Sequence, residues 1–337
     1  MTSTIARRRA PVLPAPRGPV SEFVLAALRD GSLTLPPVDD DLDGYGEDVQ
    51  LTLYCLYELH YRGFEGVDPD REWDPLLLAV RAELERAFLL ALQADVTPSD
   101  DVAVALDALL VEPADAWGVS HHLRRDGELW QLREYVAHRS LYHLKEADPQ
   151  AFVIPRLDGV AKATLVTIEH DEYGAGDPDR MHSRLFADMM RGLGLSDGYG
   201  HYVDAAPAET LAEVNFMSLC GLHRRLRGAL VGQFATVELT SSPGSDRLVK
   251  AMRRMGCDDA VAAFYSEHVE TDAVHEQLIR RGVLTPLLAD EPELAADVVF
   301  GIRASTLLAG RLGSLLLERW AAGEPSLRHP LPAAPLP

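Results

Sequence analysis

The stretch FYSEHVETDAVHEQLI, from Phe264 to Ile279, carries two histidines and an aspartate at helical spacing. His268, Asp272 and His275 stand at positions i, i+4 and i+7, and an α-helix turns about 100° per residue, so their side chains fall within roughly 60° of one another. Two imidazoles and a carboxylate on one helix face form a set of three ligands for a first-row transition metal. The alternative is a solvated helix face that happens to hold two histidines. A metal site therefore requires further ligands from the rest of the chain.

Composition and charge set broad limits on function. The chain has 337 residues, 47% of them hydrophobic, which is enough to build a sizeable core. The net charge is −20, with 52 acidic residues against 32 basic ones. This balance argues against a nucleic-acid partner or an anionic membrane surface. Part of the acidic excess is also available as metal-ligating carboxylate.

Cysteine usage and the apolar segments bear on the compartment. Cys55, Cys220 and Cys257 are odd in number and far apart, and no CxxC pair exists. These features argue against a zinc ribbon, a cysteine-ligated iron–sulfur cluster and a disulfide scaffold. The apolar stretch 295–320 is interrupted by charged residues, and the arginines at 7–9 precede prolines rather than an apolar run. We therefore expect a cytoplasmic protein without a membrane span or secretory signal.

Apolar periodicity predicts an all-α fold. No strand-and-turn rhythm, βαβ alternation, phosphate loop or repeat of solenoid length is present. We expect helices over residues 20–28, 47–64, 73–92, 101–110, 129–146, 161–173, 178–192, 211–238, 246–255, 258–281 and 286–320. A bend is expected near Gly228 or Gly232, and a turn over residues 241–246. The expected organisation is a disordered Pro- and Arg-rich segment over residues 1–19, a single domain over 20–323 and a loose Pro-rich tail over 324–337.

Several histidines have ordinary structural explanations. His60 follows Glu58 by two residues, so the two side chains point to different helix faces, and we expect a structural role for the histidine. His121 and His122 lie in a polar connection, where adjacent histidines are usually exposed. They are not included in the candidate site.

Seven acids and histidines instead interrupt apolar helix faces. They are Glu146, Glu172, His182, Glu238, His268, Asp272 and His275. Four carboxylates and three imidazoles suit a pair of iron or manganese ions with bridging carboxylates. Carboxylate oxygens stabilise the ferric state and imidazoles hold the ferrous one, and open coordination positions would admit O₂. Outside the helix trio, each residue taken singly is better explained as a scattered polar side chain.

Four segments together resemble a known family. They are RSLYHLKEADPQAFVIPRLDGVAKA at 139–163, EHDEYGAGDPDRMHSRLFADMM at 169–190, VEL at 237–239 and FYSEHVETDAVHE at 264–276. In order and spacing they resemble the iron-containing redox enzymes, also called haem-oxygenase-like diiron oxidases and oxygenases. The likeness covers residues 134–281 in detail. It implies a haem-oxygenase-like helical bundle, here with additional N-terminal helices.

The resemblance also implies roles for the seven residues. Glu172 would be a bridging or near-bridging carboxylate, with His182 ten residues after it. Glu238 would lie thirty residues before His268, and the helix trio would bind the other side of the site. Glu146 would be the additional carboxylate of members with a seven-residue site. Glu169 and His170, next to the motif, are not expected to be ligands.

Two other iron proteins compare less well with this sequence. Ferritin-like diiron proteins use Glu-x-x-His pairs, and this chain contains none. A haem enzyme needs one axial histidine in an apolar pocket and has no use for four carboxylates.

The function implied by the resemblance is that of an O₂-dependent non-haem diiron oxidase or oxygenase. It would use two iron ions (Fe²⁺/Fe³⁺) and O₂ as co-substrate on a small metabolite, in specialised biosynthesis. N-oxygenation of an amine or amino acid is the first expectation. The alternatives are oxidative C–C cleavage or desaturation, and a non-catalytic metal- or haem-binding protein on the same scaffold. Expected partners are the small-molecule substrate, a second copy in a homodimer and a reductase, and the resemblance does not identify the electron donor.

Overall fold

The computed structural model describes residues 10–31, 42–113 and 115–332. Within these ranges the regular structure is helical and no strand occurs, which confirms the expected all-α class. The α-helices are α1 (Pro19–Asp30), α2 (Glu47–Glu58), α3 (Pro75–Asp95), α4 (Val102–Leu110), α5 (Val119–Arg125), α6 (Leu129–His143), α7 (Asp148–Ala151), α8 (Gly159–Glu172), α9 (His182–Gly192), α10 (Ala208–Leu222), α11 (Arg227–Arg254), α12 (Asp259–Gln277), α13 (Thr285–Asp290) and α14 (Ala295–Ala321).

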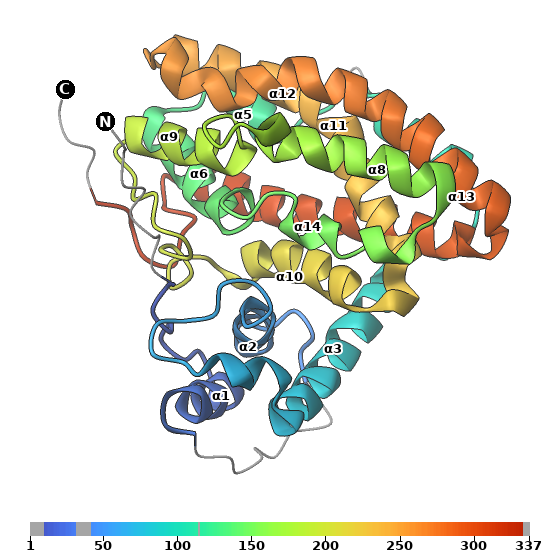
Figure 1. Ribbon diagram of the computed structural model, residues 1–337. Coiled ribbons are helices and arrows are strands. Elements are labelled where there is room, and N and C mark those ends of the chain that lie inside the picture. The colour runs from blue at the N-terminus through green and yellow to red at the C-terminus, as the bar shows by residue number, and fades with distance from the viewer. Residues whose placement is uncertain (1–9, 32–41, 114, 333–337) are drawn as a thin grey trace.

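Helix α11 lies at the centre of the bundle. It packs against α12 on one side and α14 on the other, and α9 packs against α12. Figure 1 shows α8 and α9 beside α12, with α14 and then α10 below them. The N-terminal helices α1, α2 and α3 lie below α10, and α2 packs directly on it. The helices α6, α8, α9, α11 and α12 carry the candidate residues or end next to them.

Helices α11 and α14 approach closely because each has a glycine that faces a backbone carbonyl of the other helix. A Cβ on Gly232 of α11 would stand 2.1 Å from the Val298 carbonyl oxygen of α14. A Cβ on Gly301 of α14 would stand 2.0 Å from the Ala229 carbonyl oxygen. Of the two positions predicted for a bend, Gly228 closely follows a break in the chain at η4 (Arg224–Leu226). Gly232 lies within the continuous helix α11 and provides close packing instead.

Two local predictions needed correction. Residues 241–246 form no turn, because α11 runs through them with Pro243 inside the helix. The Ser242 hydroxyl there donates to the Val269 carbonyl of α12 at 3.1 Å, so tertiary contact holds a segment rich in helix breakers. His121 and His122 lie in the short helix α5 rather than a loop, and the His122 ring stacks on Trp320.

Both terminal segments make specific contacts where the structure describes them. Among residues 10–18, placed in the expected disordered segment, Arg17 donates to Glu47 at 2.6 Å. In the expected loose tail, the backbone N–H and hydroxyl of Ser326 donate to Glu134 at 2.9 and 2.7 Å. Residues 10–18 and 324–332 are thus packed onto the bundle. Residues 1–9 and 333–337 lie outside the described ranges.

The last helix, α14, is both long and apolar. Among the described residues, the stretch Pro292–Ala321 is long and apolar enough to cross a membrane by length and composition. Its side chains Val298, Ile302 and Leu308 are buried in the core that α11 also lines. These buried side chains explain part of the apolar character of α14, and a helix in a protein core can pass the same test.

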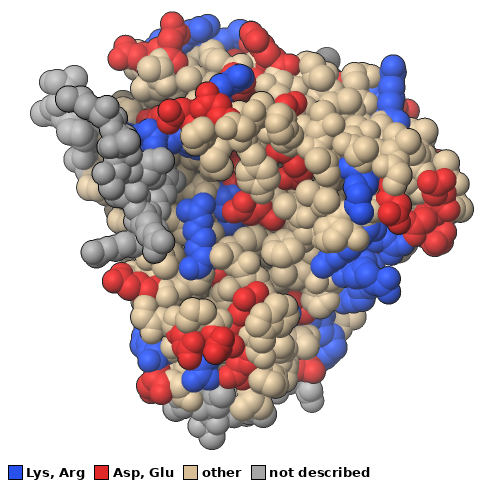
Figure 2. All heavy atoms as spheres, in the orientation of Figure 1, with Lys and Arg blue, Asp and Glu red and all other residues tan. Residues whose placement is uncertain are grey.

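Charged side chains of both signs share the surface. On the face drawn in Figure 2, acidic and basic side chains are interspersed among neutral ones. Many form local pairs, such as Lys250 with Asp246 at 2.6 Å, which contribute little stability when exposed. The informative charges are those inside the protein, where an unpaired carboxylate is costly.

Candidate metal centre

The structure brings all seven predicted residues together. They form two groups, Glu146, Glu172, His182 and His268 in one, and Glu172, Glu238, Asp272 and His275 in the other. Within each group, one ligand atom from every residue lies within 4.8 Å of those of the others. All seven side chains are buried, and Glu172 belongs to both groups. A carboxylate shared in this way would be placed to contact a metal ion in either group.

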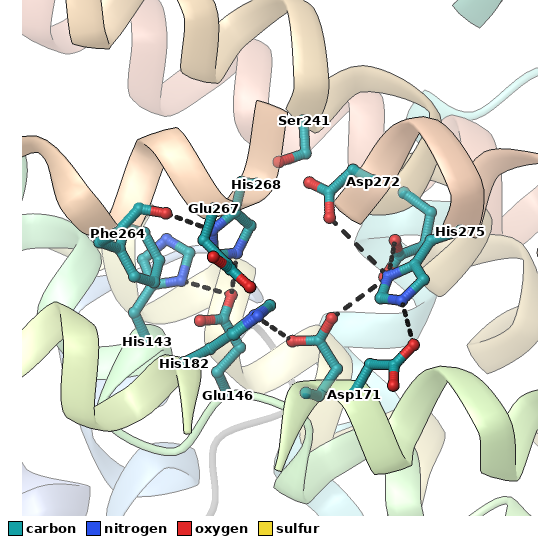
Figure 3. A network of polar contacts seen from close by, with 12 residues as sticks. His143, Glu146, Asp171, His182, Ser241, Phe264, Glu267, His268, Asp272 and His275 are labelled. Atoms are coloured by element: carbon teal, nitrogen blue, oxygen red, sulfur yellow. Dashed lines mark hydrogen bonds and ion pairs between the residues drawn. The ribbon is translucent and has the colours of Figure 1, made fainter. Parts of the chain in front are cut away.

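Helix α12 contributes one face of the centre. His268, Asp272 and His275 point from it toward the side chains of the other helices (Figure 3). The Nδ1 of His268 lies 2.7 Å from the Phe264 carbonyl oxygen, one turn earlier. Because only a protonated Nδ1 can donate to that carbonyl, the hydrogen bond leaves Nε2 directed at Glu146, 3.7 Å away. The helical periodicity that predicted the trio accounts for this face.

Glu146 follows the end of α6, where a turn replaces the predicted last helical residues. Ala147, the next residue, has a left-handed φ of 74°, which changes the chain direction there. Glu146 Oε1 lies 2.7 Å from Nδ1 of His143, and Arg139 Nε donates to Nε2 of the same imidazole at 3.4 Å. His143 therefore accepts at Nε2 and donates from Nδ1. The other oxygen of Glu146 is buried without a hydrogen-bond partner among the described residues.

Glu172 and His182 meet across a glycine break. Glu172 is the last residue of α8 and His182 the first of α9, and their Oε2 and Nδ1 atoms lie 2.7 Å apart. Gly174 between them has φ +74°, and a Cβ there would stand 2.6 Å from the Met181 amide nitrogen. Helix α9 begins at His182, four residues later than the start predicted at Pro178.

The second group centres on His275. Its Nδ1 lies 3.2 Å from Glu238 and 3.4 Å from Glu172. Its Nε2 lies 3.4 Å from Asp171, which sequence reasoning did not single out although it precedes Glu172 directly. The sequence predicted that Glu238 ends a helix. It lies instead within α11, where its buried carboxylate faces α12.

Burial and mutual charge shift the pKa values of these groups. Burial raises the pKa of Glu238 to about 8, with repulsion from neighbouring carboxylates adding to it. Burial alone lowers the pKa of His275, but Glu172 and Glu238 outweigh it and raise the pKa to about 11. Burial is likewise outweighed at His268, whose pKa Glu146 raises to about 10. In the metal-free protein, Glu238, His268 and His275 therefore hold protons beside buried carboxylates, and a bound cation would displace these protons.

The donor set fits two iron ions. Each group offers carboxylate oxygens and one or two imidazoles, the ligand mixture typical of carboxylate-bridged dimetal sites. Glu146 Oε2 and Asp272 Oδ2 are buried without hydrogen-bond partners among the described residues. A buried carboxylate oxygen without a donor is costly unless a cation neutralises it. A metal in each group would satisfy both oxygens.

Neighbouring titratable residues lie outside both groups. Glu169 is buried, and burial raises its pKa to about 9. His170 is exposed beside Asp171, and His60 pairs with Glu72 at 2.8 Å. None of them belongs to the two candidate groups.

A cavity of about 550 Å³ reaches the first group. Glu146, His143 and His268 form part of its wall, and α10, α11 and α14 supply most of the remainder. Arg139 and Glu213 also line it, and neither was predicted as a site residue from the sequence. Arg139 stands one helical turn before His143, so the i, i+4 spacing would have indicated the contact between them.

Comparison with known proteins agrees with this geometry. A nitrosourea synthase from Streptomyces achromogenes subsp. streptozoticus is 25% identical over 166 residues, which are 49% of this chain and 35% of that enzyme. The match therefore spans about a third of that relative's length. A family model described as an iron-containing redox enzyme matches residues 133–310, more than half of the chain. The family has a haem-oxygenase-like helical fold, which confirms the resemblance and the fold class. This chain belongs to the family of iron-containing redox enzymes.

Proposed function

We propose that the protein is an O₂-dependent non-haem diiron oxidase or oxygenase that acts on a small metabolite. The observation that carries the proposal is the pair of four-residue groups that share Glu172. Glu146, His182 and His268 would hold one iron, and Glu238, Asp272 and His275 the other. Two ferrous ions, when bound, supply the electrons and open coordination positions that activate O₂.

The residues around the centre would orient the ligands and keep water out. Phe264 packs against the rings of His268 and Phe186, with centroids 4.3 and 5.0 Å apart. Phe186 also covers His143 at 4.8 Å. These aromatic rings form an apolar wall beside Glu146. His143 directs its Nδ1 proton to Glu146 and so orients that carboxylate.

The cavity beside Glu146 and His268 is the proposed substrate site. Its volume of about 550 Å³ is in the range of small-molecule pockets. N-oxygenation of an amine or amino acid is the favoured reaction, and it is supported by the relative that is named for making a nitrosourea. Oxidative C–C cleavage or desaturation on the same centre is the second candidate.

Anaerobic titration with Fe²⁺ tests the metal centre. We expect two irons per chain in the wild type and fewer in His268→Ala and His275→Ala, which remove a ligand from different groups. His170→Ala is the matched control, since that histidine is exposed one residue before Asp171. One iron or none in the wild type would overturn the diiron assignment, and two irons in His268→Ala would remove the α12 trio from the ligand set.

Exposure of the loaded protein to O₂ with a panel of amines tests the reaction. The N-oxygenation proposal expects substrate-dependent O₂ consumption and a product heavier by one or more oxygen atoms. Incorporation of label from ¹⁸O₂ would identify O₂ as the oxygen source. If the amines give only dehydrogenation or fragmentation, the second candidate replaces N-oxygenation.

A further inference from the structure

An ion pair lies inside the protein on the wall of the cavity. Arg139 of α6 donates from Nη1 to Oε2 of Glu213 on α10 at 2.7 Å. Their side chains are 21% and 11% exposed, and both line the cavity that reaches Glu146. The two charges therefore face the space where a substrate would bind.

Stability alone does not explain this pair. The free energy lost when two charges leave water is often as large as the free energy gained from their attraction. Apolar residues of similar volume therefore often stabilise a core equally well. A charge pair that faces a cavity instead offers binding groups at fixed positions. The guanidinium retains an amino group, Nη2, for which no hydrogen bond is found among the described residues, since its bonds run from Nε to His143 and from Nη1 to Glu213.

The pair is also linked to the candidate metal centre. Arg139 Nε donates to His143 at 3.4 Å, and the same imidazole donates to Glu146 at 2.7 Å. Only one imidazole thus separates the guanidinium from a candidate iron ligand. A molecule held by the ion pair would lie in the cavity that the His143 and Glu146 side chains also line.

We propose that Arg139 and Glu213 select a substrate that carries both a carboxylate and an ammonium group, as a free α-amino acid does. The carboxylate would bind the guanidinium of Arg139, and the ammonium would bind the carboxylate of Glu213. A molecule with only the carboxylate would meet repulsion from Glu213, and one with only the amine would meet repulsion from Arg139. This assignment rests on the proposed function, because it takes the cavity as the substrate site.

Isothermal titration tests the proposal on iron-loaded protein without O₂, which prevents turnover, and on metal-free protein. The ligands are the proteinogenic L-amino acids, each with its deaminated carboxylic acid and its decarboxylated amine. We expect at least one amino acid to bind about tenfold or more tightly than both of its analogues. Failure of every amino acid to bind, or equal binding of the analogues, would overturn the proposal.

Three variants assign the selectivity to the pair. Glu213→Gln keeps the size and a hydrogen-bond acceptor for Arg139, and should abolish the preference for the amino acid over its deaminated analogue. Glu209→Gln, on the same helix but outside this cavity, should bind as the wild type does. The double variant Arg139→Met with Glu213→Gln removes both charges without leaving one unpaired, and should lose binding while it stays folded by circular dichroism. Unchanged selectivity in Glu213→Gln or retained affinity in the double variant would contradict the assignment.

Iron content separates this proposal from the proposed function. Neither Arg139 nor Glu213 belongs to a metal group, so Glu213→Gln should bind as much iron as the wild type. Two irons without amino-acid binding would overturn only the substrate assignment. Selective amino-acid binding by a wild type that takes up no iron in the Fe²⁺ titration would overturn only the diiron function.

Discussion

The backbone at Gly174 lies against the backbone at Met181. A Cβ on the glycine would stand 2.6 Å from the Met181 amide nitrogen, and the glycine has a φ of +74°. This contact brings the end of α8 to the start of α9, and with it Glu172 to His182. The absence of one side chain therefore permits the geometry of two candidate ligands.

Gly174→Ala should impair iron binding. The added Cβ must push residues 180 and 181 away, which moves His182 relative to Glu172. We expect a lower iron stoichiometry or a weaker second iron in anaerobic Fe²⁺ titration. Gly176→Ala is the matched control, since its φ is +88° but nothing lies within 4 Å of its Cβ position. Equal iron binding by the two variants would show that the contact does not position the ligands.

The stability of the metal-free protein should fall as the pH rises. The pKa of Glu238 is about 8 in the folded protein, and those of His268 and His275 are about 10 and 11, all above their ordinary values. A group whose pKa is higher in the folded than in the unfolded protein stabilises the fold fully at a pH below its unfolded-state pKa. That stability is lost as the pH rises through its folded-state pKa. The melting temperature of metal-free protein should therefore decrease from pH 6 to pH 9.

Iron should oppose this loss of stability at high pH, because a bound metal replaces the protons on Glu238, His268 and His275. The gain in melting temperature on adding Fe²⁺ anaerobically should be larger at pH 8 than at pH 6. Glu238→Gln, which cannot titrate, should show a shallower decrease in the metal-free form. A melting temperature of the metal-free wild type that does not change between pH 6 and pH 9 would contradict the expected linkage.

Gly232→Ala should destabilise the bundle. Its Cβ would stand 2.1 Å from the Val298 carbonyl oxygen, so α11 and α14 must separate. Such overpacking costs about 1–3 kcal/mol of unfolding free energy. Gly310→Ala, on α14, has nothing within 4 Å and should be neutral or stabilising by up to about 1 kcal/mol. Chemical denaturation of both variants measures the contrast, and equal effects would exclude the close-approach explanation.

The buried pair of Lys145 and Glu58 should be sensitive to loss of one partner. Lys145 Nζ lies 3.0 Å from Glu58, and both side chains are at most 1% exposed. Lys145→Met leaves a buried carboxylate unpaired and should cost about 3–5 kcal/mol of unfolding free energy. Lys145→Met combined with Glu58→Gln should recover most of the loss in urea denaturation. A double variant no more stable than the single one would show that charge is not the cause.

Part of the candidate site could be predicted from the sequence, because the spacing of residues along one helix decides which side chains share a face. His268, Asp272 and His275 share a face of α12 for the same reason that any i, i+4, i+7 set does. The other four residues were candidates because they interrupt apolar helix faces, the family resemblance gave them roles, and the structure places them beside the trio. That they bind iron stays a prediction.

Other features depended on packing between distant segments. The turn predicted at 241–246 is helical, and the hydroxyl of Ser242 there bonds to α12. Local propensity cannot anticipate such a contact. The role of Gly232 likewise depends on the backbone of α14, more than sixty residues later.

By itself the sequence determined the helical class, the shared face of α12 and, through its resemblance, the family. These features follow from periodicity and local residue order. Only the tertiary structure decided that Glu172 lies in both groups and that Arg139 meets Glu213 in a cavity beside Glu146. Those arrangements bring together side chains from separate helices, and their geometry depends on how closely the helices pack.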